Sequence, residues 1–250
     1  MQQTILNKLS EIEKQHNIKI LHAVESGSRA WGFASPDSDY DIRFIYKRQT
    51  QEYLNLWEKQ DTIEFMTNED LDGSGWDLNK TLKLLAKSNG ALLEWLFPPV
   101  VYKTDVVFSS KMQALAKETF SPIATLHHYL GTTKNFMEVC EAEKVKLKSY
   151  FYALRSALAG KWIVDNKTIP PVAFKELIPL APAHIQQKTD ELLEIKAVQD
   201  EKYLHPKEVL ITNYLKEIIA YNQKNAASLP SGKKVNEKLE EFFRTEIQSK

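Results

Sequence analysis

The chain has 250 residues, of which 43% are hydrophobic and 26% charged, and its formal net charge is zero. This composition indicates a globular protein with one large core or two modest ones, and it excludes a global basic field that would recruit nucleic acid. The single cysteine, Cys140, excludes an intramolecular disulfide and a thiolate zinc cluster, and the lack of a long apolar run or signal pattern predicts a cytoplasmic protein with no membrane contact.

The first 110 residues alternate between helical and strand patterns. Ile5, Leu9 and Ile12 recur at helical spacing and predict a leading amphipathic helix. The stretch after Asp39 is aromatic and β-branched, which favours a strand. The expected elements are helices at 4–16, 76–85 and 92–97, strands at 18–25, 40–46, 61–66 and 100–102, and a turn at 72–75.

From about residue 110 the sequence reads as one helix after another. Ser121 and Pro122 form a typical N-cap and first helical residue. The expected helices cover residues 122–139, 143–164, 174–178, 183–203, 205–221 and 236–248. We therefore expect an α+β domain over residues 1–110, followed by an all-helical, substrate-binding domain over residues 111–250.

Residues 27–41 join a Gly-Ser turn to an Asp-x-Asp pair. Successive side chains of a strand point to opposite faces, so Asp39 and Asp41 share one face. Two carboxylates suit Mg²⁺, which binds through carboxylates and substrate phosphates, and the amides of Gly27 and Ser28 can approach phosphate oxygens. The alternative is a Ser/Asp-rich turn before an ordinary strand. That alternative does not explain why the acid Asp41 lies within an apolar run.

The order strand, Gly-Ser, Asp-x-Asp, strand resembles the signature of the DNA polymerase β-like nucleotidyltransferase superfamily. Four further strings, at 74–80, 92–96, 99–102 and 146–155, resemble a bacterial and phage family of predicted nucleotidyltransferases that includes RNA-repair-associated members. The chain departs from the family pattern at Asn79-Lys80 and at Ser156, neither of which is an expected metal ligand. The resemblance implies a polymerase β-like palm, a small mixed sheet flanked by helices, followed by the helical domain.

The resemblance also implies a reaction, the transfer of a nucleoside monophosphate from an NTP to an acceptor with release of pyrophosphate. Two Mg²⁺ or Mn²⁺ ions about 3.5–4 Å apart would clamp the attacking and leaving oxygens. Asp39 and Asp41 would bridge these ions, and Gly27 and Ser28 would hold the terminal phosphates. Arg29 would add a bidentate phosphate contact, or else it is a solvated loop charge.

A third carboxylate is expected on a neighbouring strand, both as a metal ligand and as a catalytic base. Glu64 is the first choice, because it lies between Ile63 and Phe65 in an expected strand. Asp77 is the alternative, although an acid at the start of a helix also serves as an ordinary N-cap. Asp61 is the third candidate, after Glu64 and Asp77.

The expected helix at 143–164 carries a second set of candidates. Lys144, Lys148, Tyr152 and Arg155 recur at i, i+4, i+8 and i+11 and form one polar stripe. We expect this stripe to bind the nucleotide, although a solvated basic side of an amphipathic helix is the simpler alternative. Trp31 lies between Ser28 and Asp39, in a segment that we call the motif loop. Its ring would either stack on a base or hold this loop in place.

Three functional hypotheses remain open from the sequence. The first is a metal-dependent nucleotidyltransferase, and the second is a catalytically silent nucleotide- or RNA-binding, regulatory member of the same fold. The third is an antitoxin-like partner of a helical ribonuclease. The acceptor is unidentified, with an RNA end among the candidates, and neither the oligomeric state nor the role of the last 70 residues can be read from the sequence.

Overall fold

The computed structural model describes residues 1–67 and 70–249, which form two compact units. Unit 1 consists of Met1–Gly27, Asp39–Thr119 and Lys233–Lys250, and unit 2 of Ser28–Ser38 and Phe120–Gly232. The main division therefore falls at residues 119 and 120, near the expected boundary. The division into residues 1–110 and 111–250 nevertheless needs correction, because residues 28–38 belong to the second unit and residues 233–250 to the first.

Unit 1 is built on a five-stranded mixed sheet with the strand order β3-β4-β2-β1-β5. Its strands are β1 (Lys19–Glu25), β2 (Tyr40–Lys47), β3 (Thr62–Thr67), β4 (Leu71–Asp77) and β5 (Val101–Thr104). β2 and β4 run parallel, and the other neighbouring strands run antiparallel. This arrangement confirms the expected α+β class and the small mixed sheet.

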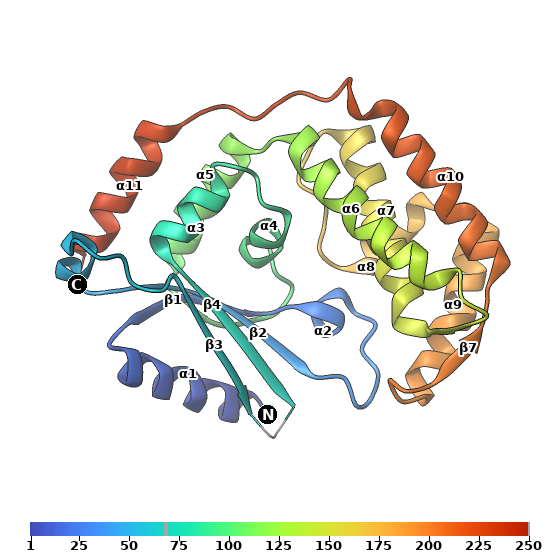
Figure 1. Cartoon of the computed structure of the whole chain (residues 1–250), viewed down its shortest axis with the longest axis horizontal. Coiled ribbons are helices and arrows are strands. Elements are labelled where there is room, and N and C mark those ends of the chain that lie inside the picture. The colour runs from blue at the N-terminus through green and yellow to red at the C-terminus, as the bar shows by residue number, and fades with distance from the viewer. Residues whose placement is uncertain (68–69, 250) are drawn as a thin grey trace. The chain divides into compact units, whose positions relative to one another are not determined.

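The two faces of the sheet are covered by different helices (Figure 1). Helix α1 (Gln2–His16) places its apolar stripe against one face, where Ile42, Phe44 and Tyr46 of β2 are fully buried. The helices on the opposite face are α3 (Leu78–Leu85), α4 (Gly90–Leu96) and α5 (Val106–Thr119). On that face Trp76 of β4 stacks on Trp95 of α4 at a centroid distance of 3.8 Å.

The expected turn at 72–75 is wrong, because these residues lie in the middle of β4. Their glycines are needed for packing on the sheet. A Cβ atom on Gly73 would lie 2.0 Å from the Phe65 ring, and one on Gly75 would lie 2.0 Å from the Phe44 ring. The two aromatic rings thus occupy the space that side chains would take, and a glycine-rich string here marks a strand under aromatic rings.

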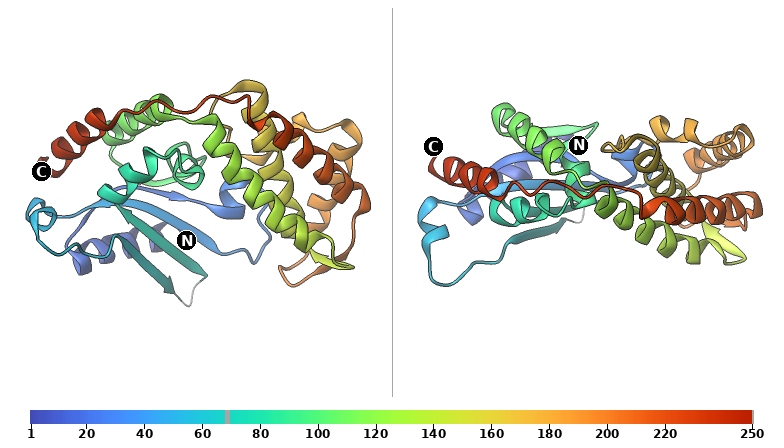
Figure 2. Two further views of the ribbon diagram at one scale, coloured as in Figure 1. Left: turned by 45° about the horizontal axis from the view of Figure 1, so that its top comes forward. Right: turned by 90° about the horizontal axis from the view of Figure 1, so that it is seen from above.

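Unit 2 is helical apart from one short β-ribbon (Figure 2). Helices α6 (Pro122–Cys140), α7 (Leu147–Asn166) and α10 (Val209–Ala226) pack against one another. The remaining elements are β6 (Lys144–Lys146), α8 (Phe174–Leu177), the 3₁₀ turn η2 (Ile178–Leu180), α9 (Ala183–Val198) and β7 (Leu204–Pro206). β6 pairs with β7, so α7 and α10 each begin later than the expected helices at 143 and 205.

Residues 28–38 belong to unit 2 because their aromatic side chains are part of its core. The short helix α2 (Gly27–Trp31) begins in unit 1 and leads into this segment. Phe33 is only 3% exposed, and its ring lies 5.3 Å from that of Phe151 and 5.7 Å from that of Phe174. An apolar side chain two residues beyond the end of α2 thus decides which core this segment joins.

Helix α11 (Asn236–Gln248) belongs to unit 1 because its last turn is fastened there. Lys47, at the end of β2, is 5% exposed. Its ammonium group donates to the carbonyl oxygens of Glu246 and Ser249, at 2.7 and 2.6 Å, and to the Ser249 hydroxyl at 2.8 Å. These carbonyls lie at the C-terminal end of the helix, where the Glu246 carbonyl also accepts the Ser249 hydroxyl at 2.8 Å. A buried cation there completes the hydrogen bonding of this end and suits the helix dipole.

Within residues 1–67 and 70–249, no helix combines the length and the apolar character needed to cross a membrane.

Replacing Lys47 with methionine tests how α11 is held. Because Lys47→Met removes a buried charged donor from the carbonyls of Glu246 and Ser249, we expect the free energy of unfolding to fall by about 2–3 kcal/mol, measured by urea denaturation. Hydrogen exchange should accelerate over residues 237–248. Lys111→Met is the matched control, because Lys111 contacts Glu246 of the same helix from a half-exposed position and should change stability by less than about 1 kcal/mol. Equal effects of the two variants would contradict this account.

Candidate active site

Two carboxylates lie where β2 begins in unit 1. Asp39 is exposed and immediately precedes the strand, and Asp41 is its second residue, with 26% of its side chain exposed. Asp41 and Arg43 alternate with the buried Ile42 and Phe44, so they lie on the face opposite α1. Asp41 therefore lies at the end of the sheet where β2 begins, and Asp39 lies just outside the strand, so the alternation within β2 assigns a face to Asp41 alone.

Gly27 is fitted to the carboxylate of Asp41. Its φ angle is +60°, and a Cβ atom there would lie 2.0 Å from Asp41 Oδ2. The preceding residue, Ser26, donates its backbone N–H to the Asp41 carbonyl at 2.8 Å. Glycine is therefore required twice, by the left-handed backbone and by the space that the carboxylate fills.

Glu25, the buried last residue of β1, fixes the backbone of Asp41 through a hydrogen bond. It is 3% exposed, and its Oε1 accepts the backbone N–H of Asp41 at 2.8 Å. The hydroxyl of Tyr102, on β5, donates to Oε2. The chain turns away from the sheet at Gly27, so the Glu25 side chain supplies an acceptor where the strand backbone no longer does. Sequence analysis missed this residue, and its only signal was an acid that ends an apolar strand.

Asp72 is a third acid at this end of the sheet. The register of the parallel strands places it directly beside Asp41. The guanidinium of Arg43 bridges the two, with Nη2 lying 3.0 Å from Asp41 Oδ1 and 2.8 Å from Asp72 Oδ2. Asp72 was not predicted, because the string at 72–75 resembled a turn, and Arg43 was not singled out within its expected strand.

The two residues predicted as the third carboxylate lie elsewhere. Glu64 is exposed on β3 and lies opposite Ser74, so β4 separates it from β2 by about 10 Å. Asp77 lies five positions beyond Asp72, at the far end of β4 and about 16 Å along the strand.

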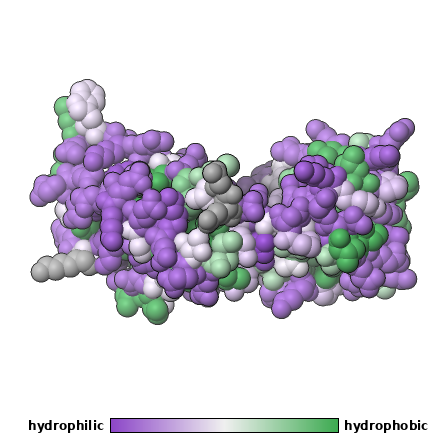
Figure 3. Space-filling model, turned by 90° about the horizontal axis from the view of Figure 1, so that it is seen from below, coloured by the Kyte–Doolittle hydropathy of each residue, from purple (hydrophilic) through white to green (hydrophobic). Residues whose placement is uncertain are grey.

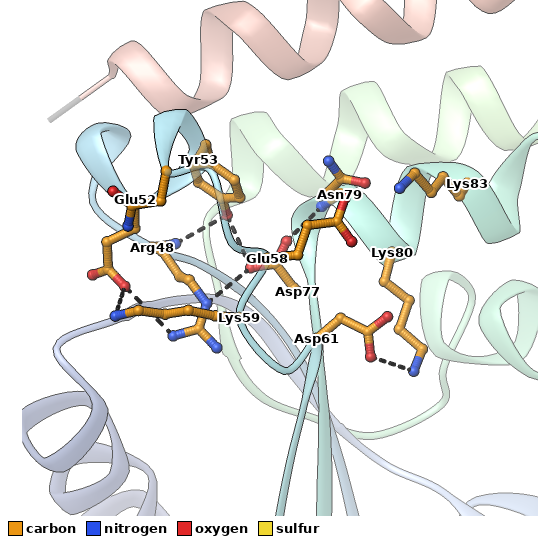
Figure 4. A pocket seen from close by; sticks show the side chains of 11 residues that line it. Arg48, Glu52, Tyr53, Glu58, Lys59, Asp61, Asp77, Asn79, Lys80 and Lys83 are labelled. Carbon is orange, nitrogen blue, oxygen red and sulfur yellow. Dashed lines mark hydrogen bonds and ion pairs between the residues drawn. The ribbon is translucent and has the colours of Figure 1, made fainter.

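Asp77 has a structural role that explains its position (Figure 4). Its Oδ1 accepts the backbone N–H of Asn79 at 2.8 Å and thereby caps α3, and its Oδ2 accepts the Tyr53 hydroxyl at 3.1 Å. Burial raises the pKa of Asp77 above its usual value, against the lowering effect of these hydrogen bonds. The N-cap interpretation is the one that this geometry favours.

The donor chemistry at the end of the sheet where β2 begins suits a hard cation. Carboxylate oxygens are the ligands that Mg²⁺ prefers, and Asp41 supplies them from β2 while Asp39 supplies them from the residue immediately before the strand. Within the part of the chain that the structure describes, no three His, Cys, Asp or Glu side chains already converge on one metal position. Arg43 instead neutralises part of the negative charge at Asp41.

The predicted nucleotide-binding stripe belongs to unit 2, and its members have different surroundings there. Lys144 lies on β6 and is exposed, whereas Lys148 lies on α7 and pairs with Glu201 at 2.7 Å. Burial raises the pKa of Glu201, but hydrogen bonds from Lys148 and Ser38 outweigh it and leave this pKa below its usual value. Lys144 is thus the stripe residue that does not lie on the helix.

Tyr152 and Arg155 hold Trp31 of the motif loop. The Trp31 and Tyr152 rings meet edge to face at 4.7 Å, and the guanidinium of Arg155 lies 4.3 Å from the Trp31 ring centroid. Arg155 is 2% exposed and also donates to the carbonyl of Val172 at 3.0 Å. Of the two roles expected for Trp31, pinning the loop is the one that these contacts favour.

The last residues of the motif loop are fastened to the segment after α9. Ser38 donates to Glu201 at 3.0 Å, and Asp37 accepts the Glu201 backbone N–H at 3.1 Å. The buried Lys196 donates to the Ser35 hydroxyl at 2.5 Å. Residues 196–201, in a part of the chain for which the sequence suggested no role, therefore fix the loop that leads into Asp39.

Arg29 and Ser28 are used within the same loop. Arg29 donates through Nη2 and Nε to the carbonyl of Ser38, at 2.6 and 3.2 Å, which closes the loop on itself. Ser28 is 6% exposed, and its carbonyl accepts the N–H groups of Gly32 and Phe33 at 3.0 Å. Contacts of Ser28 and Arg29 with phosphate remain predictions.

Solved structures of nucleotidyltransferases resemble this chain at low sequence identity. Spectinomycin adenyltransferase AAD(9) from Enterococcus faecialis, determined with ATP and spectinomycin, matches 86% of this chain and 98% of that chain, with 13% identity and a TM-score of 0.49. A nucleotidyltransferase-like protein from Exiguobacterium sibiricum 255-15 matches 91% of this chain and 75% of that chain, with 10% identity and a TM-score of 0.34.

Sequence comparison gives a more direct relationship. The uncharacterized protein YcgL of Bacillus subtilis (strain 168) is 39% identical over 237 residues, which cover 94% of this chain and 91% of that protein. A model of the RNA repair pathway DNA polymerase beta family, RlaP, matches residues 1–245. The family resemblance carried by the motifs is thereby confirmed, and this chain belongs to the RNA repair pathway DNA polymerase beta family.

Proposed function

We propose that this protein transfers a nucleoside monophosphate from an NTP to an acceptor, with release of pyrophosphate. The observation that carries the proposal is the Asp39–Asp41 pair where β2 begins, with the Gly27 backbone fitted against the Asp41 carboxylate. This arrangement occurs in a chain whose family is named for DNA polymerase beta.

In this proposal some residues bind the metal and others position the residues that bind it. Asp39 and Asp41 would hold Mg²⁺ or Mn²⁺, and the metal would supply charge neutralisation for the triphosphate. Gly27 brings backbone rather than a side chain to the carboxylate, and Glu25 fixes the backbone of Asp41. Arg43 holds Asp41 and Asp72 in one orientation.

Asp72 is our choice for the third carboxylate, in place of Glu64 or Asp77. Its support is position, because it lies beside Asp41 on the adjacent parallel strand. Glu64 lies one strand further away, and Asp77 is the buried cap of α3 at the other end of β4. Asp72 and Asp41 also form ion pairs with the same Arg43 guanidinium, so the two carboxylates interact through a shared cation.

An RNA end is the acceptor that we propose to test first. The family description places its members in RNA repair. The zero net charge of the chain argues against binding along a long RNA tract, whereas a terminal hydroxyl requires contact with few phosphates. Protein hydroxyls and small molecules are the competing acceptors.

The first prediction concerns the motif acids. Pure protein incubated with each α-³²P-labelled NTP, Mg²⁺ or Mn²⁺ and a pool of RNA ends and proteins should transfer label, and the Asp39→Ala/Asp41→Ala variant should lose at least about 10³-fold of this rate. Asp61→Ala is the control, because Asp61 pairs with Lys80 at the distant end of the sheet. Binding of Mg-NTP without transfer by the wild type would favour the silent, nucleotide-binding alternative, and no binding would contradict both.

The second prediction compares the three candidate acids. Asp72→Asn should lower kcat by about 10²-fold or more and raise the Mg²⁺ concentration needed for half-maximal rate, because it removes a charge beside Asp41. Glu64→Gln should change kcat by less than about threefold. Asp77→Asn keeps a good N-cap residue and should leave the metal dependence unchanged. An Asp72→Asn enzyme with normal kcat would rule out this assignment.

The third prediction concerns Glu25 as a positioning residue. Glu25→Gln retains an oxygen acceptor for the Asp41 N–H and a polar partner for Tyr102, so we expect kcat within about threefold of wild type. Glu25→Ala removes both contacts and should lower kcat by about 10²-fold with little change in the KM for NTP. If Glu25→Ala proves unstable, Tyr102→Phe removes only one of the hydrogen bonds. A Gln variant as impaired as the Ala variant would show that the charge, not the position, is what matters.

A further inference from the structure

An apolar loop projects from unit 1 between the 3₁₀ turn η1 (Thr50–Leu54) and β3. Leu54, Leu56 and Trp57 are 71%, 85% and 81% exposed. Figure 2 shows the light-blue segment that contains them standing away from the sheet and helices of the unit. In Figure 3, a pale and green group likewise projects from a largely hydrophilic surface. Three large apolar side chains exposed within four residues are unusual for a monomer surface.

We call residues 54–57 the apolar loop, and the residues that flank it make well-defined contacts with the rest of unit 1. The Tyr53 ring packs edge to face on Phe243 of α11 at 5.2 Å, and its hydroxyl donates to Asp77. Beyond the loop, Arg48 donates to the carbonyl of Gln60 at 2.7 Å. These contacts fasten both flanks of the loop, which reduces the conformational entropy that the loop would lose on binding a partner.

An apolar groove lies beside the loop, between α3 and α11. Its floor consists of Leu82, Ala86, Leu239 and Phe243, and its volume is about 430 Å³. This volume falls within the range of about 300–1,000 Å³ that binding clefts occupy. Lys83 and Glu240 line its rim.

A small polar cavity joins the loop to the groove (Figure 4). It has a volume of about 110 Å³, and Asn79 and Lys83 line both it and the groove. Most of its charges are already paired, as in the Arg48–Asp77 and Lys80–Asp61 contacts at 3.5 and 2.9 Å. The cavity therefore lacks the excess charge of an ion-binding site, and it places the projecting loop and the groove next to each other on unit 1.

We propose that this surface pairs with a second copy of the chain, and that the apolar loop of each copy fills the α3–α11 groove of the other. A two-fold contact requires one patch that is complementary to itself, and adjacent loop and groove meet this requirement. The flanking charges carry no net repulsion, because Glu58 and Lys59 beside the loop, and Lys83 and Glu240 at the groove rim, each combine one acid with one base. With zero net charge, two copies have no overall repulsion to overcome.

Sedimentation equilibrium of the full chain tests the proposal. We expect the wild type to sediment as a dimer at micromolar concentration, at twice the chain mass of 28.8 kDa. Leu56→Ser/Trp57→Ser, which removes the apolar loop contact, and Ala86→Arg, which fills the groove, should each raise the dimer dissociation constant about 100-fold or more. All three positions are exposed, so these variants should fold normally by circular dichroism.

A matched control and a mixing experiment complete the test. Val106→Ser/Val107→Ser removes another exposed apolar pair of unit 1, 69% and 63% exposed, and should leave the dimer intact. Mixing the loop variant with the groove variant should restore association, because one intact loop can then enter one intact groove. A monomeric wild type, a control that dissociates equally, or a mixture that stays monomeric would each overturn the proposal.

Discussion

The half-buried carboxylate of Asp41 is the constraint on which the rest of the site depends. A charged group that is partly buried in a sheet is costly unless its surroundings offer hydrogen bonds or opposite charge. Arg43 offers the opposite charge to the Asp41 carboxylate. Glu25 fixes the backbone of Asp41 by accepting its N–H, and Gly27 leaves room for Oδ2. The turn at Gly27, the end of β1 and the start of β2 are therefore one structural unit rather than three separate features.

The second general feature is that distant segments complete each unit. The loop that carries the motif is closed by Arg29 and fastened by Lys196 and Glu201, which follow it by more than 150 residues. Helix α11 returns to the sheet unit, where Lys47 receives its last turn. Three residues of the predicted nucleotide-binding stripe lie on α7 and contact other parts of unit 2: Tyr152 and Arg155 contact Trp31, and Lys148 pairs with Glu201.

Much of the fold could be predicted from the sequence, and the failures have physical causes. Helical periodicity identified α1, α6 and α7, since burial of one helix face imposes a regular repeat. The string at 72–75 was misread because glycine is common both in turns and beneath aromatic rings, and local sequence does not distinguish the two. Asp72 was missed for the same reason, and Glu25 because an acid at a strand end has no local pattern that announces a buried acceptor.

The sequence by itself determined the class of fold and the family, because burial imposes characteristic periods on helices and strands and a family match spans residues 1–245. It also singled out Asp39 and Asp41 as the candidate metal ligands. Tertiary structure alone decided which third acid stands beside Asp41, which core receives residues 28–38, and where α11 ends. Those outcomes depend on strand register and on contacts between residues far apart in the chain, and neither leaves a periodic signal in the sequence.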